Sequence, residues 1–413
     1  MNTLLSVAWF SLLSRKKTVV LTFLSLTISI MVLLSVEHIR LQAKESFNRT
    51  ISGVDLIVGA PSGQLNLLLY TVFRMGSPTN NIDYESYEML RDHELVKWAI
   101  PISLGDSHRG FRVMGTNDGY FEHYKYGNKQ ALGFEDGRAF ETLFEAVIGA
   151  DVAKALNYQV GDKIVIAHGI GSTSFTNHDK APFTISGIIS ATGTPIDKTV
   201  HVSLPAIDAI HLSSKALAQV VANPSELSPT PTSVTGVMLG LNSKFATFTL
   251  QRNINNYPDD RLMAVLPGVA MAELWTLMAT VENLLRVIAA LVLVSSLIGL
   301  STMLLASMNE RKAEIAVFRV LGAGPTTILL LILLEALILV SLSIGAAMLG
   351  LSLALVGLET WLASEFGLFL SSDILSPELL SMTGFVLAAT VVVSILPGLE
   401  AYRNALFVQL SGK

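Results

Sequence analysis

Long uncharged apolar runs alternate with charged segments along the chain. The first run, residues 18–36, follows Arg15, Lys16 and Lys17 and is long enough for a helix that spans a membrane. The run is long for a signal peptide, and no small-residue cleavage site follows it before Glu37. Because basic residues favour the cytoplasmic side, the pattern predicts an uncleaved transmembrane helix that begins in the cytoplasm.

Three more apolar runs lie towards the C-terminus. In chain order they cover residues 287–308, 326–358 and 379–396. The middle one is longer than a single crossing needs, so we expect the span to occupy only part of it. The loop at 309–325 is rich in Lys and Arg, whereas the loop at 359–378 carries acids only. This asymmetry predicts four spans arranged as one plus three, an external loop at 359–378 and a cytoplasmic tail at 397–413.

The segment between the first and second runs, residues 37–286, is about 250 residues long, which is enough for one or two folded domains. Alternating apolar and polar positions, bounded by Gly, Asn, Asp and Pro, predict strands at residues 111–114, 163–167 and 183–189. Both ends of the segment have a helical pattern. We therefore predict an α-helical membrane protein with a large mixed α/β extracytoplasmic domain, joined to the spans by helical stalk ends.

The residues before the first span also have a helical pattern. Apolar residues recur at helical spacing, namely Leu4, Leu5, Ala8, Trp9, Leu12 and Leu13. Residues 1–17 are therefore expected to form an amphipathic elbow in the cytoplasmic interface, with a frayed terminus as the alternative.

Composition agrees with a membrane protein and excludes several classes. Hydrophobic residues make up 51% of the chain and charged residues 15%. The formal net charge of −5 shows no basic excess, so no nucleic-acid partner is expected. The chain has no cysteine, which excludes disulfides, thiolate metal sites and cysteine nucleophiles.

Catalytic signatures are missing from the sequence. Gly161-Asp162-Lys163 lacks the spacing and the Ser/Thr of a phosphate-binding loop, and His93-Glu94 lacks the second histidine of a zinc helix. We therefore predict that the chain is not an enzyme, with no catalytic residue and no cofactor of its own. If the chain takes part in active transport, ATP and Mg are therefore expected on a separate subunit.

All eight histidines lie in the extracytoplasmic segment, at His38, His93, His108, His123, His168, His178, His201 and His211. No two of them have ligand spacing on one helix, and this segment is most of the non-membrane chain. We predict no metal site, and metal-linked transport remains a minor alternative.

A short charged helix is expected between the second and third spans. It carries Glu310, Arg311, Lys312, Glu314 and Arg319, and it ends at a Gly-Ala-Gly-Pro sequence. We interpret these charges as the contact for a cytoplasmic ATPase; an ordinary positively charged loop is the alternative.

Glu335 lies inside the third apolar run, where an ionisable group is costly. We expect it near the cytoplasmic boundary, paired with a basic side chain that orients the charged helix, in preference to a proton relay. A second unusual feature is the apolar stretch at residues 65–75. It is interpreted as either a buried helix or a surface for lipid or a partner.

The chain resembles the MacB/LolC/FtsX superfamily of ABC transporter permeases, the type VII or mechanotransmission group. Residues 309–323 are similar to the coupling-helix signature of that family, and Pro397, Ala401 and Ala405 to its closing segment. The periplasmic core of the family is matched by residues 145–153, 160–164 and 183–189.

The resemblance implies a Porter-like part built from both ends of the outer segment and a Sabre-like part at about residues 115–200. It also implies a second permease chain, a LolD-like cytoplasmic ATPase that binds the coupling helix, and location in a bacterial inner membrane. In such machines, ATP hydrolysis drives a conformational change in the periplasm that acts on a lipoprotein, peptide, drug or other envelope substrate. A periplasmic adaptor could be involved.

Two other functions remain open at this point. An FtsX-like regulator would activate a periplasmic partner, such as a cell-wall hydrolase, without transport. A membrane sensor is the less favoured alternative. MacB carries its ATPase on the same chain, and this sequence does not, so the resemblance is stronger to the members with split subunits.

Overall fold

The computed structural model describes residues 2–127, 129–169, 176–224, 226–311, 314, 317–318, 320–366 and 376–410. The chain forms two compact units. The helical unit comprises Met1–Ala43, Ala279–Trp361 and Leu370–Lys413, and the α/β unit comprises Lys44–Met278 and Leu362–Phe369.

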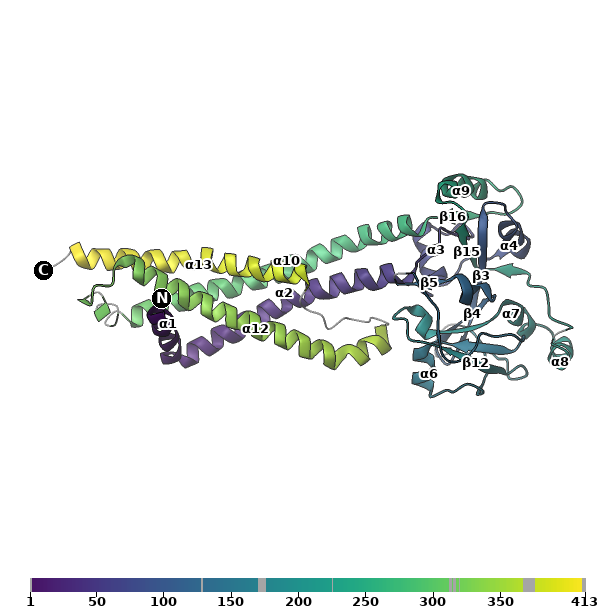
Figure 1. Ribbon diagram of the computed structural model, residues 1–413, viewed down its shortest axis with the longest axis horizontal. Helices are drawn as coiled ribbons and strands as arrows, with labels where there is room; N and C mark the ends of the chain where they lie inside the picture. Colours follow the sequence, from purple (N-terminus) through teal and green to yellow (C-terminus); the bar gives the residue numbers. More distant parts are fainter. Residues whose placement is uncertain are drawn as a thin grey trace. The chain divides into compact units, whose positions relative to one another are not determined.

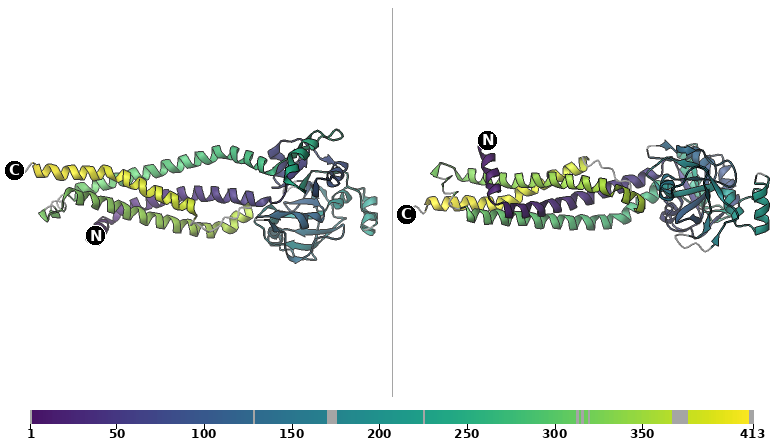
Figure 2. Two further views of the ribbon diagram at one scale, coloured as in Figure 1. Left: turned by 45° about the horizontal axis from the view of Figure 1, so that its top comes forward. Right: turned by 90° about the horizontal axis from the view of Figure 1, so that it is seen from below.

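Five long helices belong wholly or largely to the helical unit: α1 (Asn2–Ser14), α2 (Lys16–Thr50), α10 (Pro267–Glu310), α12 (Pro325–Phe366) and α13 (Pro377–Leu410). The last four run lengthwise beside one another (Figures 1 and 2). Each is long and apolar enough to cross a membrane. The four apolar runs of the sequence lie within them, one before the α/β unit and three after it.

Packing inside the helical unit combines apolar and small polar contacts. Leu26, Ile30 and Leu34 on α2 are fully buried. Beside them, the Ser296 hydroxyl of α10 hydrogen-bonds that of Ser29 on α2. In a bilayer, lipid tails contact an apolar helix surface as favourably as another helix does. Association of the helices therefore depends more on close packing and on hydrogen bonds between them than it does in water.

One branched sheet forms the frame of the α/β unit. Along its main path the strands lie in the order β16 (Met263–Val265), β1 (Leu56–Gly59), β15 (Gly236–Leu241), β3 (Val96–His108), β4 (Phe111–Thr116), β13 (Thr199–Ser203), β8 (Glu145–Ile148), β12 (Phe183–Ile189) and β7 (Phe134–Gly137). Three short strands branch from this path, namely β9 (Lys163–Ile164), β10 (Ala167–His168) and β11 (Thr176–Asn177).

The long strand β3 joins two halves of this sheet. Its first part pairs with β15 through Ile102, and its second part pairs with β4 from Ser103 onward. In the first half, β1 pairs with both β15 and β16, so the two ends of the outer segment meet. The second half is built from β4 to β13, residues 111–203. A Sabre-like part was predicted at about residues 115–200.

Helices and further short strands complete the α/β unit. They are α3 (Gln64–Thr71), β2 (Ile82–Asp83), α4 (Tyr84–Arg91), α5 (Gly119–His123), β5 (Lys125–Tyr126), β6 (Gln130–Ala131), α6 (Ala150–Leu156), α7 (Leu204–Ile210), α8 (Ser214–Ala222), β14 (Ser233–Val234) and α9 (Thr247–Asn255). Helix α3 lies in the apolar stretch that had two interpretations. Leu67 and Leu68 on it are fully buried in a core with Ile57 and Met238, which favours the buried-helix interpretation.

Candidate coupling site

A buried carboxylate holds three parts of the helical unit together. Glu335 on α12 is only 2% exposed. Its Oε1 accepts hydrogen bonds from Arg311 Nη1 at 2.9 Å and from the Ser11 hydroxyl, and its Oε2 accepts one from Arg15 Nη2 at 3.1 Å. The pairing of Glu335 with a basic side chain, expected from the sequence, is therefore present with two arginines.

Each of these partners lies at the end of a helix. Ser11 is in the last turn of α1, and Arg15 lies between α1 and α2. Arg311 follows α10 directly, and its N–H donates to Ser307 O at 3.1 Å. The hydrogen bonds of Glu335 therefore connect Arg311, which follows α10, to α12 and to the α1–α2 junction.

The charges in this site depend on one another. Arg15 and Arg311 are each 12% exposed, so all three charged groups are largely removed from water. Burial of a charge is costly unless it is paired and hydrogen-bonded. Ser11 supports the pairing, since its hydroxyl also lies 3.1 Å from Arg15 Nη2.

The charged helix that was predicted after α10 is described in part. Glu314, Val317, Phe318 and Val320 are helical, whereas Lys312 and Arg319 lie outside the described residues. Arg311 donates from Nη1 to buried Glu335 at 2.9 Å and from Nε to Glu314 at 2.6 Å. Its contact with an ATPase stays a prediction. Glu310 is exposed, and the Glu314 side chain is 58% exposed.

The end of this helix follows a recognised capping pattern. Gly322 adopts a positive φ of 94°, a conformation that glycine tolerates best. The Ala323 N–H donates to Phe318 O at 2.9 Å, as in a Schellman motif. The predicted stop at this glycine therefore has a local physical cause.

Sequence reasoning missed a second buried acid. Glu37 on α2 is 4% exposed and accepts hydrogen bonds from Arg40 on the same helix and from Arg286 on α10, the latter at 3.1 Å. Arg40 also pairs with Glu282 at 3.7 Å. Helix α2 continues through Glu37, in agreement with the helical pattern expected at both ends of the outer segment. Glu37 lies 22 residues beyond Arg15, or roughly 33 Å along a helix.

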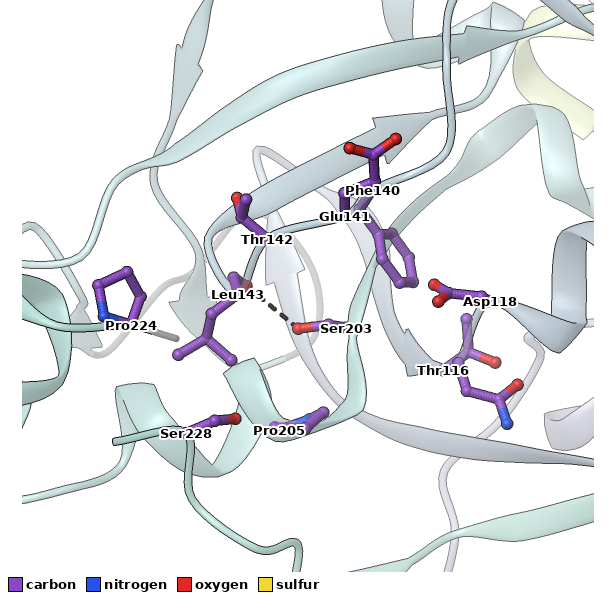
Figure 3. A pocket seen from close by; sticks show the side chains of 11 residues that line it. Thr116, Asp118, Phe140, Glu141, Thr142, Leu143, Ser203, Pro205, Pro224 and Ser228 are labelled. Atoms are coloured by element: carbon purple, nitrogen blue, oxygen red, sulfur yellow. Dashed lines mark hydrogen bonds between the residues drawn. The ribbon is translucent and has the colours of Figure 1, made fainter. Parts of the chain in front are cut away.

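The α/β unit has a pocket of about 480 Å³ where the parallel strands β4 and β13 end. Thr116 and Ser203 lie at these strand ends, and the Ser203 hydroxyl donates to Leu143 O (Figure 3). Burial, together with Glu122 and Glu141, raises the pKa of Asp118, another lining residue. The described lining residues include two carboxylates, Asp118 and Glu141, and no histidine, lysine or arginine.

A second cluster in the α/β unit was not predicted from the sequence. Asp106, His168, His178 and His211 place their ligand atoms within 4.8 Å of one another. The sequence signal that could have found part of it is the placement of His168 and His178 on either side of a short segment rich in Gly, Ser and Thr.

Two family models match the chain. The MacB-like periplasmic core domain matches residues 19–257, which is more than half of the chain, and the FtsX-like permease C-terminal domain matches residues 286–406. The chain belongs to the MacB/FtsX family of ABC transporter permeases. The permease is therefore a membrane protein with a periplasmic domain and a component of an ABC transporter.

Among solved structures, the permease is similar to the periplasmic region of MacB from Actinobacillus actinomycetemcomitans. The similarity covers 57% of this chain and 95% of that chain, with 13% identity and a TM-score of 0.34. A search of curated proteins finds no match.

Proposed function

We propose that the permease couples ATP hydrolysis by a separate cytoplasmic ATPase to a conformational change of its periplasmic domain. The observation that carries this proposal is the Glu335 site. It joins the residues after α10 to α12 and to the α1–α2 junction through charged hydrogen bonds. A force on the helix that contains Glu314 would therefore move several spans together.

Mechanotransmission also requires a structural connection from the helical unit to the periplasmic domain. Helices α2 and α10 each run without interruption from the helical unit into residues of the α/β unit. Glu37 and Arg286 bind these two helices to each other within the helical unit. The pairing favours movement of α2 and α10 as one body, as mechanotransmission requires.

The proposed partners come from the family resemblance together with this mechanism. We propose a LolD-like ATPase, a second permease chain in a bacterial inner membrane, and an envelope substrate such as a lipoprotein, peptide or drug. A periplasmic adaptor is compatible with the same arrangement. The alternative of an FtsX-like regulator uses the same coupling and differs in the protein bound on the periplasmic side.

Purification of the tagged permease from native membranes tests the proposal. We expect an ABC ATPase subunit to copurify, and Glu314→Arg to reduce its yield severalfold because Glu314 is exposed on the cytoplasmic helix. Glu273→Arg is the matched control, since Glu273 is an exposed acid on α10 within the α/β unit. Failure of any ATPase to copurify, or equal losses in both variants, would contradict the proposal.

A further inference from the structure

We propose that Asp106, His168, His178 and His211 form a binding site for a divalent transition-metal ion, with zinc as the best fit. The four residues come from separate parts of the α/β unit. Asp106 is on β3, His168 is on β10, His178 follows β11, and His211 caps the C-terminus of α7.

Strand pairing brings the first three residues together. β10 pairs antiparallel with β3, and His168 lies directly opposite Asp106. The same strand pairs with β11 on its other side. The His178 N–H then donates to Ile166 O at 3.0 Å, which holds this residue beside the strand pair.

Ring nitrogens and a carboxylate oxygen converge at this point. His168 Nδ1 lies 3.0 Å from Asp106 Oδ1 and 3.2 Å from His211 Nε2. His211 Nε2 lies 3.8 Å from the same Asp106 oxygen. Ligands at zinc distances of 2.0–2.1 Å in a tetrahedron are about 3.3 Å apart, so only small shifts are needed along these edges.

Hydrogen bonds to α7 prepare His211 and His178 for coordination. His211 Nδ1 lies 2.6 Å from Ile207 O, and because a carbonyl only accepts, Nδ1 carries the proton and Nε2 keeps its lone pair. His178 hydrogen-bonds the backbone of Ile210. Metal-binding histidines usually have their second nitrogen held in this way.

His178 gives independent support for a ligand at this cluster. Its Nε2 is buried and has no hydrogen-bond partner among the described residues. An unpaired buried polar atom is costly, whereas coordination to a metal would satisfy it.

The donor set indicates which ions fit. Three imidazoles and one carboxylate suit zinc and its neighbours in the first transition row, whereas calcium and magnesium prefer oxygen ligands. Asp106 is 2% exposed and would supply the negative charge, while the His168 side chain is 60% exposed and leaves the site accessible. Coordination would link β3, the paired strands β10 and β11, and α7.

Zinc binding by the purified full-length permease tests this proposal, with an affinity tag that contains no histidine. After dialysis against zinc, we expect about one ion per chain by metal analysis, as the four ligands of a closed zinc site imply. Titration calorimetry with Zn²⁺ should show affinity at least tenfold lower in His168→Ala and in His178→Ala. His168→Ala changes an exposed side chain, so it is not expected to unfold the protein.

His123→Ala is the matched control, because His123 is a half-exposed histidine outside the cluster that stacks on Trp98. Zinc binding should be unchanged in this variant. As a second measurement, Co²⁺ should give the intense visible spectrum of a tetrahedral site, and His178→Ala should abolish it. Absence of bound zinc in the unmodified protein, or the same affinity in all variants, would overturn the proposal.

Discussion

At the scale of single residues, two buried carboxylates of the helical unit each have more than one charged partner. Glu335 has two arginines and a serine hydroxyl as partners, and Glu37 has two arginines. The sequence could single out Glu335, since it interrupts an apolar run. It could not identify Arg15 and Arg311 as the partners, because all three residues are far apart in the chain and meet only through helix packing.

Removal of the Glu335 charge should destabilise the helical unit. In Glu335→Gln, Arg15 and Arg311 become unpaired in a buried site, and breaking such a set costs about 3–5 kcal/mol. Thermal unfolding in detergent should show a lower midpoint for this variant, with partial recovery in the double variant Glu335→Gln, Arg311→Met. Glu378→Gln, at an exposed acid of α13, is the control that should leave the midpoint unchanged. An unchanged midpoint in Glu335→Gln would show that the pairs do not stabilise the bundle.

A buried histidine should make the α/β unit sensitive to acid. His201 is fully buried, and burial, aided by Arg74, lowers its pKa to about 3. In the unfolded chain the pKa is about 6.5, so between these values the unfolded state binds a proton that the folded state does not. Stability is therefore complete above about pH 6.5 and falls at lower pH, by up to roughly 1.4 kcal/mol per pH unit.

Denaturant unfolding at pH 7 and pH 5, followed by tryptophan fluorescence, measures this effect. His201→Phe keeps an aromatic ring beside Tyr120 and should reduce the loss of stability between the two pH values. His123→Phe, at a half-exposed histidine, should retain it. Equal losses in the unmodified protein and in His201→Phe would show that His201 does not titrate as described.

At the scale of secondary-structure elements, hydrophobic periodicity predicted helices and strands whose pattern lies within a few residues. It did not predict features that form only when separate elements pack together. The four apolar runs and the strands at residues 111–114 and 183–189 follow from patterns within a few residues. The burial of α3 could not be decided, since an apolar helix has the same sequence pattern against protein or lipid. The histidine cluster was missed because its ligands meet through pairing of β10 with β3.

Close backbone approach before α6 gives a prediction at this scale. A Cβ atom at Gly149 would lie 2.3 Å from Ile196 O and 2.4 Å from Asp197 O, and neither backbone atom can turn away. Gly149→Ala should therefore destabilise the α/β unit by about 1–3 kcal/mol or more. Gly105→Ala on β3 is the control, because nothing lies within 4 Å of its added Cβ. Equal unfolding midpoints in denaturant for the two variants would contradict this account.

At the scale of the whole molecule, the arrangement of one span, a periplasmic domain and three spans was predictable from hydropathy and charge, and the family models agree with it. The substrate could not be predicted, since it depends on the surface of a domain that no short motif describes. Two helices, α2 and α10, run from the helical unit into the α/β unit. If the permease transmits motion to its periplasmic domain, ATP binding should change the conformation or dynamics of these two helices.

Hydrogen-exchange mass spectrometry of the permease–ATPase complex in lipid nanodiscs tests this claim most directly. The exchange rates of residues 44–50 and 267–278, the parts of α2 and α10 within the α/β unit, are compared with and without trapped ATP. We predict that ATP changes these rates and that Glu335→Gln reduces the difference. Identical exchange in both segments of the unmodified complex, with and without ATP, would contradict the account.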